Sequence, residues 1–442
     1  MDRMAFLLNI SMSGIKNIEK EIRIDFYGKN INKSSSFDNY NIKAIYGENG
    51  SGKTAIIIAV KIVKDFILNE SYLSDSRNVE LLYDLINKKT RKFYFRCEFV
   101  TNIEEFIIHE YEVSLEIDKD NEIVVTYESL KERINSVKNV QNTLFCIEKG
   151  VFTELNLPDV VKDTVIDKTK NVLEKRSAIT LIMSILNNDL KSNAIPQELL
   201  YSFIFFILLY VYNDLEDSHT HYYRKSRIGQ YINNKASADS QVVFSALEEL
   251  YYEIYSNDRK VPIDAIKSYE NRINRLEKFV KIFKPMLKGI LIDKKINHDI
   301  YECRLIMDYG SYLVDREFES TGIKRIMDMF DAFVSASNYG IVFIDELDSN
   351  INGVYLNKLI EYYRDYGKGQ LCFTSHNTEP MTLLKQNKKA IDFLINDNRI
   401  VSWVKNGHYT ADNSYRDGMI EGLPFNVDSS DFIGIFGWEN QD

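Results

Sequence analysis

The feature that most constrains this chain is a short glycine-rich run between a predicted strand and a predicted helix. Residues 47–54 read Gly-Glu-Asn-Gly-Ser-Gly-Lys-Thr and fit G-x-x-x-x-G-K-[ST], the spacing of a loop that holds nucleotide phosphates. The preceding residues Ile42–Tyr46 are predicted to form a buried strand, and residues 55–68 an apolar helix. A glycine-rich turn can match this pattern by accident, but the order of strand, loop and helix favours a nucleoside triphosphate site.

The chemistry of phosphate binding gives each position of this loop a role. Glycines let the backbone approach the phosphates, with N–H groups pointing inward at the N-terminus of a helix. Lys53 is expected to reach the β and γ phosphates, and Thr54 to hold Mg²⁺ through its hydroxyl group. The expected nucleotide contacts are Gly47, Glu48, Asn49, Gly50, Ser51, Gly52, Lys53 and Thr54.

Two predicted strands in the last third of the chain end in polar residues. Residues 340–344 run into Asp345 and Glu346, so a buried parallel strand would place both carboxylates at the carboxyl edge of a sheet. Asp345 is expected to bind Mg²⁺, directly or through water, and Glu346 to polarise the attacking water as a general base. A second strand over residues 370–374 leads to His376, which suits a sensor of the γ-phosphate; an ordinary loop histidine is the alternative.

A further anion site is predicted where Ser320 and Gly322 precede an apolar-periodic helix over residues 325–336. Residues of these types at a helix N-terminus leave backbone N–H groups available to an anion. One chain therefore has a phosphate loop and a separate anion site. A head-to-tail dimer would bring the two together around a nucleotide.

Hydrophobic patterning divides the chain into three parts and predicts an α/β fold. Residues 1–150 contain the phosphate loop, residues 151–300 are predicted to form a helical insertion for oligomer or partner contacts, and residues 301–442 return to strands and motifs. A mixed sheet would then be built from both ends of the chain. An antiparallel β-subdomain is predicted from three runs rich in Phe, Tyr, Val and Ile, at residues 92–100, 106–117 and 122–130.

Composition and charge exclude some classes of function. The chain is 45% hydrophobic with a net charge of −10, which favours a globular protein and argues against one that coats nucleic acid non-specifically. The densest basic spot, residues 224–227, is interpreted as an exposed loop. The apolar residues 199–212 fall short of the roughly 18 to 20 residues of a membrane span, so a buried helix or subunit interface is expected there. Four widely separated cysteines indicate neither a zinc site nor a disulfide framework, so a reduced cytoplasm is the expected compartment, and the N-terminus shows no signal-peptide pattern.

The order of phosphate loop, Ser-x-Gly, apolar-Asp-Glu and Ser-His resembles the ABC-type ATPases of the SMC, RecF and OLD (overcoming lysogenization defect) branch. Residues 49–53, Asn-Gly-Ser-Gly-Lys, are typical of that branch. The resemblance implies an ABC-type P-loop NTPase head, with ATP sandwiched between the loop of one subunit and Ser320 and Gly322 of the other. It also implies that Asp348 lies at the dimer interface and that His376 is the switch histidine.

The signature differs from the Leu-Ser-Gly-Gly-Gln of ABC transporters, because Thr321 replaces the first glycine. This difference argues against a transporter motor. The chain is more similar to the single-chain ATPases of bacterial anti-phage systems of the PARIS and AbiL type. That similarity implies an ATPase subunit that senses infection through a phage-encoded trigger and controls a separate toxic effector.

Two functions therefore remain open. In the first, an abortive-infection system, the effector is expected to be a separate, nuclease-like protein, because the segment after His376 is shorter than the nuclease domain of OLD nucleases. The alternative is a RecF- or SMC-like DNA repair ATPase that clamps DNA. Both functions imply ATP and Mg²⁺ as ligands and a homo-oligomer with at least one head-to-tail dimer, and the choice between them rests on family analogy.

Overall fold

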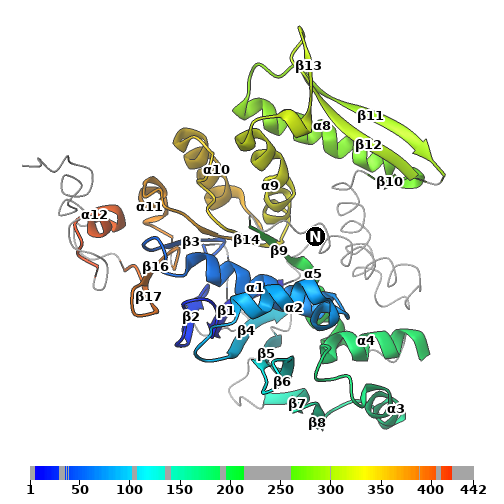
Figure 1. Cartoon of the computed structure of the whole chain (residues 1–442). Helices are drawn as coiled ribbons and strands as arrows, with labels where there is room; N and C mark the ends of the chain where they lie inside the picture. Colours follow the sequence, from blue (N-terminus) through cyan, green and yellow to red (C-terminus); the bar gives the residue numbers. More distant parts are fainter. Residues whose placement is uncertain are drawn as a thin grey trace, which may run out of the picture.

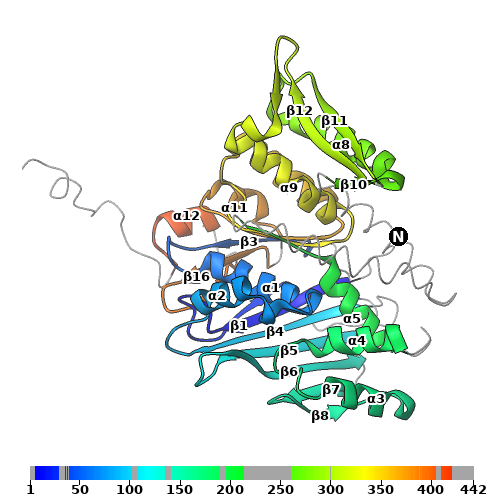
Figure 2. The ribbon, with the colours of Figure 1, turned by 45° about the vertical axis from the view of Figure 1, so that its right-hand side comes forward.

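The computed structural model consists of three β-sheets and helices stacked in layers (Figure 1, Figure 2). It describes residues 5–28, 35, 37, 39–101, 107–134, 141–189, 196–213, 260–298, 300–387, 389–404 and 410–420. The α/β class predicted from the sequence is confirmed, with a mixed sheet next to an antiparallel one.

The mixed sheet lies at the centre and combines strands from distant parts of the chain. Strand β15 lies between β3 and β14, and every pair from β16 to β9 is parallel, while β17 pairs antiparallel with β16. In spatial order the strands are β17 (Arg399–Ser402), β16 (Ile391–Ile395), β3 (Ile42–Tyr46), β15 (Gln370–Thr374), β14 (Ile341–Ile344) and β9 (Leu209–Tyr212).

Both faces of the central sheet are buried, which explains its nearly continuous apolar strands. On β14, Ile341 and Phe343 join the core that contains helix α1 (Lys53–Leu68). Val342 and Ile344 point the other way, into the core that contains helix α9 (Thr321–Ser337). Because side chains alternate along a strand, α1 and α9 cover opposite faces of the sheet (Figure 2).

The second sheet is antiparallel and confirms the predicted meander. The predicted runs correspond to β4 (Lys92–Thr101), β5 (Ile107–Ile117) and β6 (Ile123–Ile134), which pair in sequence order. Its inner face packs against α1, α4 and α5. The remaining strands are β1 (Ala5–Ser13) and β2 (Ile22–Asp25) on one side, and β7 (Gln141–Glu148) and β8 (Val151–Leu155) on the other.

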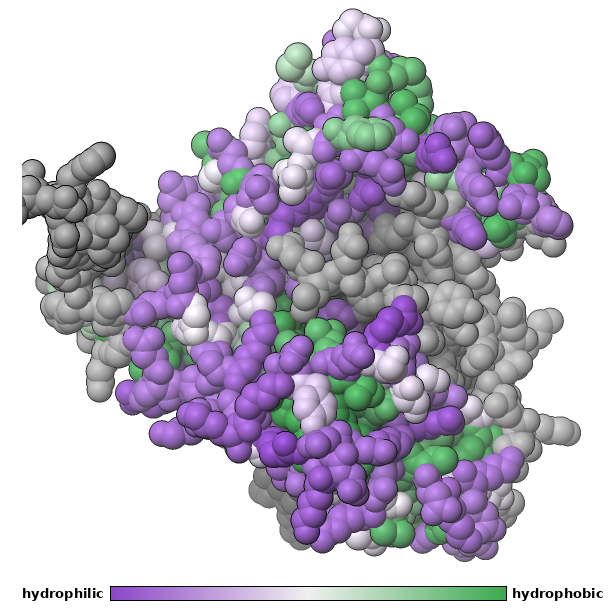
Figure 3. Space-filling model, viewed as in Figure 1, coloured by the Kyte–Doolittle hydropathy of each residue, from purple (hydrophilic) through white to green (hydrophobic). Residues whose placement is uncertain are grey.

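The third sheet belongs to a smaller layer beyond α9, at the top of Figure 1. Its strands are β10 (Lys260–Pro262), β12 (Ile300–Asp308), β11 (Gly289–Asn297) and β13 (Leu313–Asp315), and helix α8 (Ile266–Phe283) packs against it and against α9. Hydrophobic side chains gather on this layer in Figure 3, where Leu291, Ile296 and Leu313 are 48%, 65% and 60% exposed. Residues 151–300 thus combine helices with strands β8 to β11.

The apolar stretch 199–212 forms two elements. Helix α5 (Gln197–Leu208) is buried in the core with α1, which confirms a buried helix. The next four residues, Leu-Tyr-Val-Tyr, leave the helix and pair with β14 as β9, since aromatic and β-branched residues suit a sheet and β14 offers a free edge. In the part of the chain that the structure describes, no helix is both long and apolar enough to cross a bilayer.

The other helices complete the layers. They are α2 (Ser76–Leu85), α3 (Asp159–Thr169), α4 (Ala178–Asp189), α10 (Gly353–Tyr366), α11 (Glu379–Leu384), α12 (Ala411–Arg416), and the 3₁₀-helices η1 (Tyr72–Ser74), η4 (Ile263–Ala265) and η5 (Arg316–Phe318).

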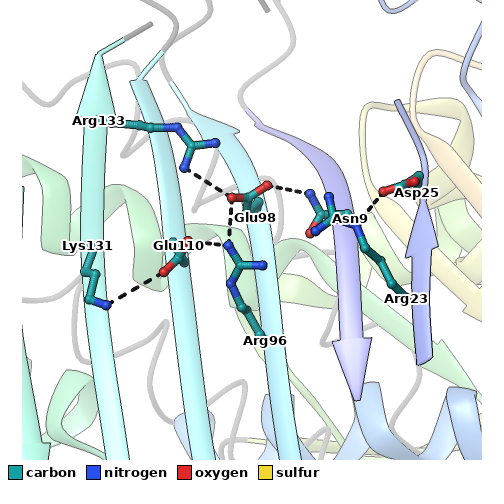
Figure 4. Close-up of polar contacts among 8 residues, drawn as sticks. All are labelled: Asn9, Arg23, Asp25, Arg96, Glu98, Glu110, Lys131 and Arg133. Carbon is teal, nitrogen blue, oxygen red and sulfur yellow. Dashed lines mark hydrogen bonds and ion pairs between the residues drawn. The ribbon is translucent and has the colours of Figure 1, made fainter. Parts of the chain in front are cut away.

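A network of ion pairs covers the outer face of the antiparallel sheet (Figure 4). Glu98 is its centre: Arg96 and Arg133 lie 3.0 and 3.1 Å from its Oε1, and Asn9 donates to its Oε2. Arg96 and Lys131 also approach Glu110 on β5. Burial by itself raises the pKa of Glu98, but the Asn9 hydrogen bond and the two arginines outweigh burial and hold that pKa below its ordinary value.

Replacing Glu98 by Gln is expected to lower the free energy of unfolding at pH 7 by about 1–3 kcal/mol, because two half-buried guanidinium groups lose their carboxylate. Since the folded-state pKa lies below the unfolded one, this stabilisation is present above the ordinary carboxyl pKa and is lost as the pH falls through the folded-state value. Urea unfolding measured at several pH values should therefore show that, as the pH is lowered, the free energy of unfolding of Glu98→Gln falls less than that of the wild type. The control is Glu361→Gln in an exposed pair with Lys358, which should change stability by less than about 0.5 kcal/mol.

Candidate functional site

The predicted phosphate loop connects the carboxyl end of β3 to the N-terminus of α1. Gly50 and Gly52 have φ angles of 80° and 113°, in the left-handed region that glycine adopts without strain. A Cβ atom on Gly47 would lie 2.6 Å from the carbonyl oxygen of Leu394 on β16. The helix begins at Lys53, two residues before the predicted start, so Lys53 and Thr54 occupy its first turn.

Lys53 is held over the loop and faces acidic residues from the other end of the chain. Its Nζ donates to the carbonyl oxygens of Gly47 and Glu48 at 2.7 and 2.9 Å, and the residue is 6% exposed. Burial lowers the pKa of Lys53, while Asp345, Glu346 and other acids act in the opposite direction. Strands β3 and β14 both pair in parallel with β15, so the phosphate loop and these two acids follow strand ends on the same side of the sheet. The fold has brought the two predicted halves of the site to one edge of the central sheet.

The turn after β14 is built around one buried hydroxyl group. Thr374, at the end of β15, donates from Oγ1 to Asp345 Oδ1 at 2.6 Å and accepts the Glu346 N–H at 2.8 Å. Asp345 is 8% exposed, and Glu346 has a positive φ of 49°. The threonine thus fixes the carboxylate of one acid and the backbone of the next.

Asp348 and His376 also meet at this edge. The carboxylate of Asp348 accepts the backbone N–H groups of His376, at 3.2 Å, and Asn377, at 3.0 Å. The His376 side chain is exposed. The loop after β15 is therefore tied to the loop after β14, and the predicted switch histidine lies next to the predicted interface aspartate.

Ser320 and Gly322 lie apart from the phosphate loop. Ser320 is the N-cap of α9 and is exposed, and a Cβ on Gly322 would lie 3.2 Å from the carbonyl oxygen of Asn350. Glu319 anchors this end of the helix, since its carboxylate accepts bonds from the Tyr309 hydroxyl and Lys284 Nζ. Within the described ranges, no hydrogen bond or ion pair joins Ser320 or Gly322 to residues 47–54.

The residues expected to hold Mg²⁺ fit that ion in type. Thr54 and Asp345 supply a hydroxyl and a carboxylate oxygen, and Mg²⁺ prefers oxygen ligands completed by water and substrate phosphates. Glu346, Asp348 and Glu48 add negative charge that acts on Lys53. Over the described residues no cluster of three or more His, Cys, Asp and Glu side chains could hold a metal by itself. The Thr54 and Asp345 assignment stays a prediction that requires phosphate oxygens.

Three residues at this site escaped the sequence analysis. Asn17 Nδ2 donates to the carbonyl oxygen of Gly50 at 2.7 Å, and Thr374 bridges Asp345 and Glu346 as described above. Arg325 donates to the carbonyl oxygens of Asp345 and Glu346. A charged residue among the apolar positions of the helix after Gly322 was the available signal for Arg325. The basic spot at residues 224–227 lies outside the described residues.

Comparisons with known proteins give distant matches. No family model and no curated protein matches this chain. Among solved structures, it is similar to an SMC head bound to the C-winged helix domain of ScpA, with 13% identity, coverage of 90% of this chain and 98% of that one, and a TM-score of 0.40. For the recombination mediator RecF with ATP, in the RecFOR pathway, the identity is 11%, the match covers 91% of this chain and 99% of that one, and the TM-score is 0.39. For the SMC head domain from Thermotoga maritima, the identity is 13%, the match covers 90% of this chain and 99% of that one, and the TM-score is 0.34. These values give no residue-level information about the site.

Replacing Thr374 by Val keeps the side-chain shape but removes the hydroxyl group. We expect a loss of about 1–3 kcal/mol in the free energy of unfolding, because the Glu346 N–H is left without its buried acceptor. Urea unfolding measures this loss. Thr382→Val is the control: its hydroxyl donates to the Glu379 carbonyl at an exposed position, and its loss should cost less than about 0.5 kcal/mol. Equal effects of the two substitutions would contradict a special role for Thr374.

Proposed function

We propose that this chain is an ATP-binding and ATP-hydrolysing subunit that acts through ATP-dependent dimerisation. The observation that carries the proposal is that the loop with Lys53, after β3, and the acids Asp345 and Glu346, after β14, follow strands that both pair in parallel with β15. Ligands of open α/β sheets bind at this edge. A loop with the phosphate-binding pattern, a buried lysine and paired acids at that position suit hydrolysis of a nucleoside triphosphate.

In the proposed reaction each residue of the site has one task. Backbone N–H groups of residues 47–54 hold the phosphates, and Lys53 moves from the carbonyls of its own loop to the β and γ phosphates. Thr54 and Asp345 would hold Mg²⁺, which neutralises developing charge on the phosphates. Glu346 orients and polarises the attacking water, and His376 contacts the γ-phosphate.

The position of α9 supports a second subunit in the complete site. Ser320 and Gly322 begin a helix on the face of the central sheet opposite α1, and no described contact joins them to their own phosphate loop. The backbone N–H groups at this helix N-terminus would bind the γ-phosphate held by a second copy. Two nucleotides would then be sandwiched between two heads in a head-to-tail dimer.

For the biological role we propose a subunit of a bacterial anti-phage, abortive-infection system that controls a separate, nuclease-like effector, in the cytoplasm. The order of sequence motifs supports this role. The exposed apolar side chains on the third sheet support partner contacts in that layer, since monomeric proteins seldom expose such groups together. The alternative is a RecF- or SMC-like ATPase that clamps DNA.

Lys53→Ala should abolish ATP binding in calorimetry, because the loop loses its only positively charged side chain. Glu346→Gln should bind ATP but lower the rate of phosphate release by a factor on the order of a hundred or more, and accumulate as a dimer in sedimentation experiments. Hydrolysis by Glu346→Gln at the wild-type rate would show that Glu346 is not the base.

Ser320→Arg tests the second subunit. A long charged side chain at the N-cap of α9 should block ATP-dependent dimerisation while ATP still binds to each monomer. The matched control is Ser74→Arg, at an exposed position on η1, which should dimerise like the wild type. Dimerisation of Ser320→Arg with ATP would refute contact in trans through the N-terminus of α9.

The two biological roles differ in what binds the ATP-locked protein. Glu346→Gln would be purified from its own host with ATP and Mg²⁺, and its companions identified by mass spectrometry. A stoichiometric nuclease-like protein that is inactive in the complex supports the anti-phage role. DNA with repair factors, and no dedicated protein partner, supports the clamp.

A further inference from the structure

The helix that begins with the predicted anion site also contacts the predicted general base. Arg325 lies in the second turn of α9 and is 6% exposed. Its Nη2 donates to the carbonyl oxygens of Asp345 and Glu346, each at 3.0 Å. The guanidinium lies over the ring of Tyr212, 5.5 Å from the ring centroid. One buried side chain therefore joins α9 to the turn after β14 and to the end of β9.

Glu346 needs support from its neighbours because its backbone is strained. A φ of 49° places it in the left-handed region, which costs a non-glycine residue about 1–2 kcal/mol. Such a conformation persists only where the surrounding structure fixes it. Here Arg325 holds the carbonyl oxygen of Glu346 from α9, and Thr374 holds its N–H from β15. Loss of either contact lets the backbone relax and redirects the carboxylate.

Arg325 is the only one of these two supports that can sense a ligand at the start of α9. The backbone N–H groups of Thr321, Gly322 and Ile323 have no acceptor within the described part of the chain, and Thr321 is exposed. Arg325 follows on the same rigid helix, whose apolar side chains pack in a core shared with α8 and α10. A shift of this helix moves the guanidinium and the Glu346 carbonyl together.

We propose that Arg325 is a positioning residue that couples contact at the N-terminus of α9 to the orientation of Glu346. This inference rests on the ATP hydrolysis proposed above and adds the regulation of its general base. Arg325 acts in this proposal through the carbonyl oxygens of Asp345 and Glu346. It increases the rate of hydrolysis when a second subunit's nucleotide binds at Ser320 and Gly322, and it leaves nucleotide affinity unchanged.

The test compares Arg325→Met, which removes the donors, with Arg325→Lys, which keeps one. Arg272→Met is the matched control: this arginine is 13% exposed and binds α9 near its middle, donating to Asp331 at 2.7 and 2.6 Å. For each protein, kcat, KM, the Kd of ATP, the melting temperature and the dependence of activity on protein concentration are measured.

In Arg325→Met we expect kcat to fall by a factor on the order of ten to a hundred, with the Kd of ATP within about threefold of the wild type. Arg325→Lys should recover part of the rate. Increasing protein concentration should stimulate the wild type but not Arg325→Met, although both dimerise with ATP. Arg272→Met should keep the stimulation, even if its melting temperature falls.

A wild-type kcat in Arg325→Met overturns the inference. It is also overturned if kcat falls only in step with ATP affinity and melting temperature, and by as much as in Arg272→Met. If Arg325→Met does not fold, Arg325→Lys decides: a lower kcat at unchanged ATP affinity supports the inference, and an unchanged kcat overturns it. A wild type that does not hydrolyse ATP is a separate outcome, which overturns the proposed function and the inference with it.

Discussion

The parallel pairing of β3 with β15 is the contact on which the rest of the structure depends. It joins the strand before the phosphate loop to a strand more than three hundred positions later in the printed sequence, from Ile42 opposite Leu371 to Ile45 opposite Thr374. Since β15 also pairs with β14, the loop and Asp345 reach the same edge of the sheet. Ordering so long an intervening chain costs conformational entropy, which the burial of both sheet faces offsets.

Burial on two faces also keeps the two predicted parts of the nucleotide site on different sides of the central sheet. Alternate residues of β14 point into two different cores, so α1 lies on one side of the sheet and α9 on the other. The phosphate loop and the N-terminus of α9 are consequently separated within one molecule. A nucleotide site that uses both must take the second part from another subunit, which makes dimerisation part of the proposed chemistry instead of an addition to it.

The edge of the central sheet combines a strained backbone with buried polar groups. Glu346 is held at a positive φ by the Thr374 hydroxyl and the Arg325 guanidinium, and Lys53 is buried, with several carboxylates opposing the lowering of its pKa by burial. Strain and buried charge at one place are typical of functional sites, because folding alone would not retain them. The N–H of Glu346 is held from β15 and its carbonyl oxygen from α9, so a motion of either element would reorient the Glu346 carboxylate.

Sequence alone determined the elements whose causes are local: the glycine loop, the apolar strands β3, β14 and β15, and the alternating strands of the antiparallel sheet. Tertiary structure decided the contacts of Asn17, Thr374 and Arg325, because each hydrogen-bonds to a residue at least 20 positions away in the sequence. It also turned the end of the apolar stretch into β9, since the open edge of β14 supplied hydrogen bonds that no local pattern encodes. The spacing of apolar residues predicts which side of a helix or strand is buried. Which other element packs against that side is decided only when the sheets assemble.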